Sequence, residues 1–238
     1  MALVKYGAGV IQMSGSIAGN TFARNRFGNY ARAKTKPVNP NSPSQAVVRA
    51  TLSFLTSRWA RTLSDDEREQ WNLYGQNVAM KNKLGEVIFL TGFNHYVRSN
   101  TLLKLRGETL VDTGPAIFEL PAKDPTIRIT VEVHESRTNL YFDADMDWVS
   151  EDNAWLFILE GMPQNPQRNF FGGPYLGIKD KHGESETPIT SPEHFTHLHV
   201  LSEGQKVWYQ FRIQRADGRI SEPFYTNAIV VAGPLPPE

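Results

Sequence analysis

Three histidines stand close together near the end of the chain and are candidates for metal chemistry. His194, His197 and His199 lie close in the sequence, and on a β-strand His197 and His199 share one face because side chains alternate. Neutral imidazole binds transition metals, and a third ligand can come from His194 or a carboxylate. Solvated histidines at a sheet edge have the same spacing, and this interpretation is favoured. His197 and His199 are therefore weak metal candidates, and no cofactor is expected.

A second set of residues combines positive charge with aromatic rings near the N-terminus. Basic residues alternate along two extended runs, with aromatic residues between them. We expect a partner-binding surface made of Phe22, Arg24, Arg26, Phe27, Tyr30, Arg32, Lys34 and Lys36. Such a surface can pair with acidic proteins, or it can bind DNA through phosphate contacts and base stacking. The predicted partners are other proteins or copies of this chain, with DNA as the alternative.

Residue patterns that support catalysis are weak in this sequence. No serine stands in a nucleophile-elbow motif, and no glycine-rich phosphate loop occurs. The chain contains no cysteine, which excludes disulfides, thiolate zinc sites and cysteine nucleophiles. The sequence therefore predicts a protein that is not an enzyme and has no catalytic residues. A signal peptide and an apolar run long enough for a membrane span are also not seen, so no membrane partner is expected.

Charge is distributed unevenly along the chain, although its net charge is zero. Residues 1–107 contain 15 Lys and Arg against 5 Asp and Glu, whereas residues 108–238 contain 10 against 20. This asymmetry predicts two modules with different neighbours. The basic half can face nucleic acid, an acidic protein surface, or the acidic half of another copy. The last arrangement would give a homo-oligomer or a lattice.

The elements that position these residues are an extended arm and a helical region. Residues 1–41 are polar and glycine-rich, and the sequence Phe27-Gly28-Asn29 predicts a turn between two strands of a β-hairpin. Residues 42–107 follow as a helical region with three starts, at Ser42, Ser64 and Thr91. The apolar stripe of the first helix is Val48, Leu52, Leu55 and Trp59, and Gly107 ends the third helix.

The second half of the chain changes to a period of two residues. Proline-rich residues 108–125 indicate a linker, residues 126–232 indicate strands, and residues 233–238 indicate an exposed tail. The expected strands are 127–133, 140–144, 155–159, 197–201, 207–213 and 225–231. The predicted fold class is α+β, with an N-terminal extended β-arm, a small helical region and a C-terminal antiparallel β-sandwich.

Two resemblances support this division. The runs Leu201–Ile213 and Asp217–Pro223 are similar to the penultimate strand and final hairpin of fibronectin type III and immunoglobulin-like domains. The runs Gly15–Phe22 and Pro37–Gln45, with Arg49, Trp59 and residues 63–71, resemble a group of phage and prophage proteins. The second resemblance implies a virion-associated structural role, after synthesis in the host cytoplasm.

The expected function is therefore structural assembly, most concretely as a phage capsid decoration, cement or connector protein anchored by the basic arm. A first alternative is a tail or baseplate component whose sandwich binds a partner or a glycan. A sugar site would need exposed aromatic residues, for which the candidates are Trp148, Phe170, Phe171 and Tyr175. A second alternative is a DNA-binding protein that uses the basic arm.

Overall fold

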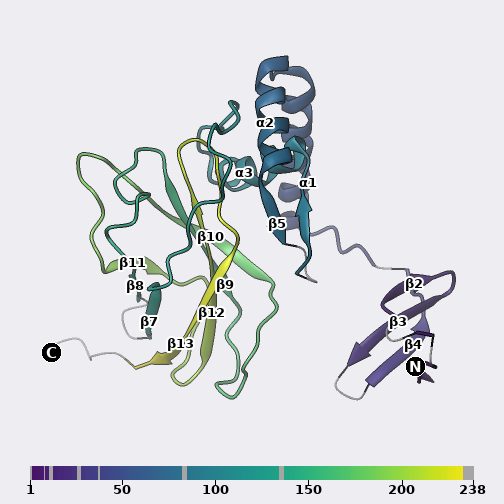
Figure 1. The fold of residues 1–238 in the computed structure, drawn as a ribbon. Coiled ribbons are helices and arrows are strands. Elements are labelled where there is room, and N and C mark those ends of the chain that lie inside the picture. Colours follow the sequence, from purple (N-terminus) through teal and green to yellow (C-terminus); the bar gives the residue numbers. More distant parts are fainter. Residues whose placement is uncertain are drawn as a thin grey trace. The chain divides into compact units, whose positions relative to one another are not determined.

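The fold is α+β, with three helices and one large mixed sheet among the residues that the computed structural model describes (Figure 1). These residues are 2–7, 9–10, 13–25, 28–36, 38–81, 85–133 and 137–232. The chain forms two compact units, Met1–Ala46 and Val47–Glu238, each considered by itself below. The expected tail, residues 233–238, lies outside the described residues, as do Arg26 and Phe27 of the arm.

The first unit is a four-stranded sheet with the order β1-β4-β3-β2. Its strands are β1 (Ala2–Leu3), β2 (Gly15–Ile17), β3 (Asn20–Asn25) and β4 (Gly28–Ala33). All of its strand pairs are antiparallel, and β3 and β4 pair from Asn20 opposite Ala33 to Asn25 opposite Gly28. The hairpin predicted from the turn residues is therefore confirmed, and two further short strands flank it.

The first helix, α1 (Pro43–Arg61), begins directly after its predicted cap residue, but its apolar stripe is less buried than the sequence pattern predicts. The Gln45 backbone N–H donates to Ser42 Oγ at 3.4 Å, as expected for an N-cap. Leu55 is buried, but Val48 and Leu52 of the predicted stripe are 52% and 48% exposed. The predicted burial of the stripe is wrong for its N-terminal half, where these two side chains remain about half exposed.

The second and third helices begin at the capping residues that the sequence predicts, and the third helix also ends at its predicted glycine. In α2 (Asp65–Asn77), Ser64 Oγ accepts from the Glu67 backbone while the Glu67 carboxylate accepts from the Ser64 backbone. In α3 (Gly92–Arg106), Thr91 caps the start and Gly107 ends the helix with a φ of 83°. That left-handed conformation favours glycine, which has no Cβ to clash. The short hairpin of β5 (Ala79–Lys81) and β6 (Val87–Phe89) connects the two helices.

The helices share a small aromatic core. Trp71 and Tyr96 are fully buried, and their ring centroids lie 5.8 Å apart in a T-shaped arrangement. Trp59, a residue of the predicted stripe, packs against the Tyr96 ring at 5.3 Å and so contacts this core. Leu55, Leu63, Tyr74 and Val78 complete the cluster.

Close backbone contact between α2 and α3 requires a glycine at the start of α3. A Cβ added to Gly92 would lie 2.5 Å from the Asn72 backbone nitrogen and 2.6 Å from the Trp71 carbonyl carbon. We therefore expect Gly92→Ala to lower the free energy of unfolding by about 1–3 kcal/mol, since backbone must move. Chemical denaturation measures this, with Gly172→Ala as control because a Cβ there meets nothing closer than 3.4 Å. Equal stability of the two variants would contradict the expectation.

The second unit also contains a seven-stranded sheet with the order β10-β9-β12-β13-β7-β8-β11. Its strands are β7 (Arg128–Glu132), β8 (Arg137–Tyr141), β9 (Trp155–Gly161), β10 (Tyr175–His182), β11 (Glu193–Thr196), β12 (Lys206–Gln214) and β13 (Phe224–Val231). All pairs are antiparallel except β13 and β7, which run parallel where Val230 and Val231 meet Val131 and Glu132. The sheet is therefore mixed, which corrects the prediction of a purely antiparallel one.

One face of this sheet encloses the main hydrophobic core. The strands alternate as predicted, so that Ile129 and Val131 of β7 are buried between exposed neighbours. Side chains from both ends of the strand order meet in this one cluster, among them Leu140 of β8 and Ile158 of β9. The sheet must therefore curl around its own core.

The other face of the sheet carries α3. Asp180, Phe157 and Arg212 stand side by side on β10, β9 and β12. Arg106 at the end of α3 forms an ion pair with Asp180, with 2.5 Å between Nε and Oδ1. Near its start, Arg98 donates to the carbonyl oxygens of Ile220 and Ser221 at 2.7 and 2.6 Å. These contacts fix the helical region to the sheet within the second unit.

The segment predicted as a linker, residues 108–125, contains no helix or strand and is nevertheless held in place. The Val111 backbone N–H donates to Asn100 Oδ1 at 2.8 Å, and Asn100 Nδ2 donates back to the Val111 carbonyl at 2.9 Å. Asp112 accepts from Arg58 of α1 and Tyr96 of α3. The segment thus binds the helices together. Across the described residues, none of the helices combines the length and apolar character that a membrane crossing demands.

Candidate functional site: the basic N-terminal unit and two cavities

The predicted partner-binding residues lie on both faces of the first unit's sheet. Opposed residues of antiparallel strands share a face, and Phe22 stands opposite Ala31 while Arg24 stands opposite Asn29. Phe22 and Arg24 therefore share one face, and Tyr30 and Arg32, opposite Ala23 and Thr21, share the other. Each face thus presents one aromatic ring and one guanidinium group.

Lys34 and Lys36 extend this set beyond the end of β4. Both are exposed and lie past Ala33, although the Lys34 backbone N–H still donates to the Gly19 carbonyl at 2.8 Å. The structure therefore places Lys34 next to the sheet, and the predicted strand that continues to Lys36 ends earlier. Arg26 and Phe27 cannot be placed, because they fall in the gap between the described residues 25 and 28.

The first unit lacks both a core and a negative charge. No residue from Leu3 to Ala46 whose side chain the structure describes is buried. The first acidic residue of the whole chain is Asp65, so all six charged side chains of residues 1–46 are basic. The positive charge of this unit therefore has no counter-ion within the unit.

The second unit begins at Val47, within α1 and directly after the basic segment. Val47, Val48, Leu52 and Phe54 are each between 41% and 55% exposed. Arg49 and Arg58 lie on the same helix, and no acidic residue does. An exposed apolar stretch of α1 therefore directly follows the basic sheet in the sequence.

The histidines proposed as weak metal ligands are not on a strand. β11 ends at Thr196, and the Glu160 carboxylate of β9 accepts from the backbone N–H groups of Leu198 and His199 at 2.9 and 3.3 Å. These bonds hold residues 198 and 199 off the sheet ladder, so the predicted strand 197–201 is wrong. In the described part of the chain, no three His, Asp or Glu side chains gather where a metal ion could bind.

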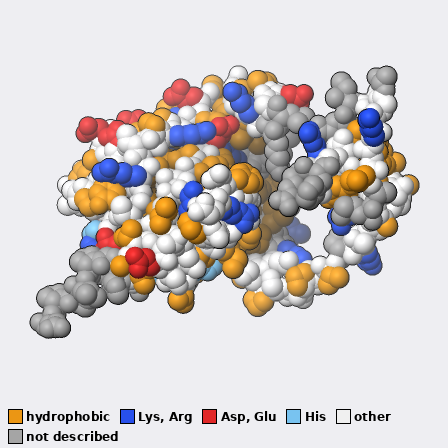
Figure 2. All heavy atoms as spheres, turned by 90° about the horizontal axis from the view of Figure 1, so that it is seen from below, with side chains coloured by type: hydrophobic (Ala, Val, Ile, Leu, Met, Phe, Trp, Pro, Cys, Tyr) orange, Lys and Arg blue, Asp and Glu red, His pale blue; other side chains and the backbone are white. Residues whose placement is uncertain are grey.

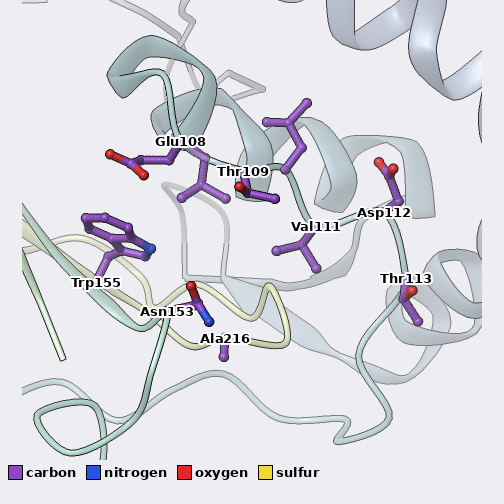
Figure 3. A pocket seen from close by; sticks show the side chains of 10 residues that line it. Glu108, Thr109, Val111, Asp112, Thr113, Asn153, Trp155 and Ala216 are labelled. Carbon is purple, nitrogen blue, oxygen red and sulfur yellow. The ribbon is translucent and has the colours of Figure 1, made fainter. Parts of the chain in front are cut away.

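The cavity in Figure 3 lies where the segment 108–113 faces the sheet, and its volume is about 380 Å³. Trp155, Asn153 and Ala216 line the sheet side, with Glu108 beside Trp155 and Asp112 at the other end (Figure 3). Arg58 donates to Asp112 through Nε and Nη2 at 2.9 and 2.5 Å, and these bonds raise the pKa of Arg58. Because Asp112 is fixed in this structural pair, the cavity does not present two free carboxylates.

A second cavity, of about 340 Å³, is lined by aromatic rings. Of the aromatic residues expected for a sugar site, Phe170 is 75% exposed, and Phe171 and Tyr175 also line this cavity. Trp148 is 1% exposed and belongs to the core, so it is not available to a sugar. Trp208 and Tyr225 complete the cavity and were missed from the sequence. Their positions, one on β12 and one on β13, come together only through strand pairing.

Comparisons with known proteins give a weak fold signal. No protein-family model and no curated protein sequence matches the chain. Among solved structures, the adhesin domain of Epf from Streptococcus pyogenes is 12% identical with a TM-score of 0.29, covering 47% of this chain and 33% of that one. The third fibronectin III domain of the human KIAA0343 protein is 12% identical with a TM-score of 0.27, covering 52% of this chain and 96% of that one. The expected resemblance to phage proteins gains no support from these matches.

A third matched structure is an enzyme. It is a family 76 glycoside hydrolase from a bovine Bacteroides thetaiotaomicron strain, 11% identical with a TM-score of 0.32. The match covers 47% of this chain, and the chain spans about a fifth of the hydrolase. The expectation that the protein is not an enzyme is corrected by this finding, although the match identifies no reaction and no catalytic residue. The weak structural neighbours of the chain thus include a fibronectin III domain.

Proposed function

We propose that the protein is an assembly protein whose N-terminal unit binds an acidic protein surface. The observation that carries this proposal is a basic four-stranded sheet in which none of the described side chains is buried. The setting that the sequence resemblance implies is a phage particle, in which the chain would act as a capsid decoration, cement or connector protein.

A sheet of this kind needs a partner for its stability. Ordering each residue costs about 1–2 kcal/mol of conformational entropy, which small sheets offset by burying one hydrophobic face. In the first unit Phe22 and Tyr30 lie on opposite faces, so these two rings do not build one apolar face. A partner that covers either face supplies the missing burial. The short edge strand β2, all of whose residues are exposed, can also pair with a strand of the partner.

The partner's acidic character follows from charge. Six basic side chains and no acidic ones in residues 1–46 favour a negatively charged surface. The second half of the chain, with 20 acidic against 10 basic residues, is such a surface on another copy. Contacts repeated between many copies make a modest affinity effectively permanent.

For the larger unit we propose a β-sandwich of the fibronectin type III kind. The strand order separates into β7-β8-β11 and β10-β9-β12-β13, joined by the short parallel pairing of β13 with β7. Core side chains come from both groups, as Leu140 and Tyr209 show. Two such groups facing each other across one core have the layout of a sandwich.

Limited trypsin digestion of the full chain, followed by intact mass measurement, tests the proposal. In dilute solution we expect fast cleavage after Arg24, Arg32 and Lys34, while the segment from about residue 47 onward survives. At high protein concentration and low salt, self-association should protect these sites. A dilute monomer whose first unit resists trypsin would contradict the proposal, because that unit would then be stable alone.

Charge-reversal variants test whether the basic sheet forms the contact between molecules. We expect Arg24→Glu combined with Arg32→Glu to weaken association at least about tenfold in sedimentation velocity experiments. The control is Lys179→Glu, a single charge reversal on β10 of the other unit, compared with Arg24→Glu alone. Equal association of the variant and the control would reject the basic sheet as the contact. DNA binding that falls steeply with salt would favour the alternative of a DNA-binding protein.

A further inference from the structure

The aromatic cavity of the larger unit has the construction of a ligand site. It lies beside the loop between β9 and β10 and is lined by Asn169, Phe170, Phe171, Gly172, Tyr175, Trp208 and Tyr225. Its volume of about 340 Å³ falls at the lower end of the range for small-molecule pockets. The size suits one or two small rings better than a folded protein surface.

The floor of the cavity is fixed by packing. Phe171 and Trp208 are stacked, with ring centroids 5.8 Å apart and an angle of 27° between their planes. Phe171 can lie there because Gly161 has no side chain, since a Cβ at that position would be 2.5 Å from the Phe171 ring. Tyr175 packs on Phe171 edge to face at 5.2 Å, and its hydroxyl donates to the Phe171 carbonyl at 3.2 Å.

The loop that carries these rings is tied to the sheet. Gln164 and Lys206 exchange two backbone hydrogen bonds of 2.9 Å, and Lys206 Nζ donates to the Arg168 carbonyl at 3.2 Å. Arg168 Nε donates to the Phe170 carbonyl at 2.7 Å. A ligand that enters the cavity therefore meets groups already in place, which lowers the entropy cost of binding.

Two rings at the rim remain exposed. Phe170 is 75% exposed and Tyr225 is 54% exposed, and Tyr225 lies 5.6 Å from Tyr175 between ring centroids. Exposed hydrophobic side chains also occur elsewhere, for example Val48 and Leu52 on α1, and Figure 2 shows several on one face of the molecule. The rings at the rim differ because they stand at one cavity, where they can contact a flat ligand.

Two cations lie next to rings that line the cavity, although neither cation is itself one of the lining residues. The Arg168 guanidinium lies 5.6 Å from the Phe171 ring centroid, and Lys206 Nζ lies 5.0 Å from that of Trp208. Within the described part of the chain their hydrogen-bond acceptors are carbonyl and amide oxygens, and neither forms an ion pair with a carboxylate. Both cations therefore remain able to pair with an anionic group on a ligand.

We propose that this cavity binds an acidic saccharide. A sugar ring has an apolar C–H face that packs on Phe170 and Tyr225. Its hydroxyl groups can bond to the Asn169 amide, and a carboxylate or phosphate on the sugar can pair with Arg168 and Lys206. A long nucleic acid fits less well, because single-stranded binding needs a continuous basic groove and residues 108–238 are acidic overall. A proline-rich peptide needs an elongated groove and no anion site.

A glycan array probed with the full chain tests the proposal. The array should carry neutral glycans, uronic-acid glycans and phosphate-bearing glycans, so that the source of the acidic group is identified. We expect acidic glycans to be retained at least about tenfold more strongly than neutral ones. The absence of any retained glycan, or equal retention of neutral and acidic glycans, would overturn the proposal.

Variants of residues in and beside the cavity test whether the glycan binds there. In titration calorimetry with the best-retained glycan, Phe170→Ala should weaken binding about tenfold, and Lys206→Met should remove the preference for acidic over neutral glycans. Phe89→Ala on β6, where the ring is 57% exposed, is the matched control and should bind as the wild type does. Unchanged binding by Phe170→Ala would overturn the proposal. Binding of an oligothymidine or a proline-rich peptide that Phe170→Ala weakens, without glycan binding, would also overturn it.

Discussion

Replacing Trp71 with alanine is expected to lower the free energy of unfolding by about 3–5 kcal/mol. The side chain is fully buried and packs edge to face against both Tyr74 and Tyr96. Its indole Nε1 donates to the Asp112 carbonyl at 2.7 Å, so the substitution also leaves that acceptor without its partner. A Cβ on Gly218 would lie 3.2 Å from the Trp71 ring, which shows that the ring also reaches the β12–β13 connection. Trp71 thus joins the helices, the segment 108–113 and the sheet.

Urea denaturation monitored by circular dichroism measures this effect. Leu73→Ala is the matched control, because it removes an apolar side chain of the same helix that is 46% exposed. We expect the control to change stability by less than about 1 kcal/mol. If Trp71→Ala and Leu73→Ala were equally stable, Trp71 would not be the link between the helices and the sheet.

Acidification from pH 6.5 to pH 4 is expected to destabilise the protein through His95 by about 3 kcal/mol. Burial and the nearby charge of Arg98 lower the pKa of His95 from 6.5 to about 4. The side chain is 2% exposed, its Nε2 atom has no hydrogen-bond partner, and the ring packs edge to face on Tyr74 at 4.9 Å. The unfolded chain therefore binds a proton near pH 6.5 that the folded chain binds only near pH 4.

The contribution of His95 has a defined pH window. Stability from this residue is complete above pH 6.5, falls as the pH decreases toward 4, and changes no further below that value. His95→Phe keeps an aromatic ring against Tyr74 and removes the titrating group. Unfolding free energies of both proteins at pH 7, 5.5 and 4 should show a shallower loss in the variant. Identical slopes would show that His95 does not titrate on unfolding.

Helix ends and the buried central strands could be predicted from local chemistry. Ser64 with Glu67 and Thr91 with Gly107 fix the ends of α2 and α3 through hydrogen bonds within a few residues. β9 and β12 are central and largely buried, so their apolar character is visible in the sequence. The edge strands β10 and β11 were missed, since one side of each is unpaired and β10 contains a register shift after Leu176.

The candidate sites could likewise be predicted only in part from the sequence. The charge and alternation of the N-terminal residues were visible in the sequence, but their distribution over two faces depends on the register of β3 with β4. His197 and His199 share a face only on a strand, and Glu160, distant in the sequence, keeps this segment from forming one.

The sequence by itself determined the starts of the helices and the end of α3, the period-two strands, the charge division and the chemistry of the N-terminal residues. These properties depend on side chains a few positions apart. The tertiary structure alone decided that the N-terminal half of the α1 stripe stays exposed and that β7 pairs in parallel with β13. It also brought Phe170, Trp208 and Tyr225 to one cavity. These features depend on contacts between residues far apart in the chain, whose partners no local pattern specifies.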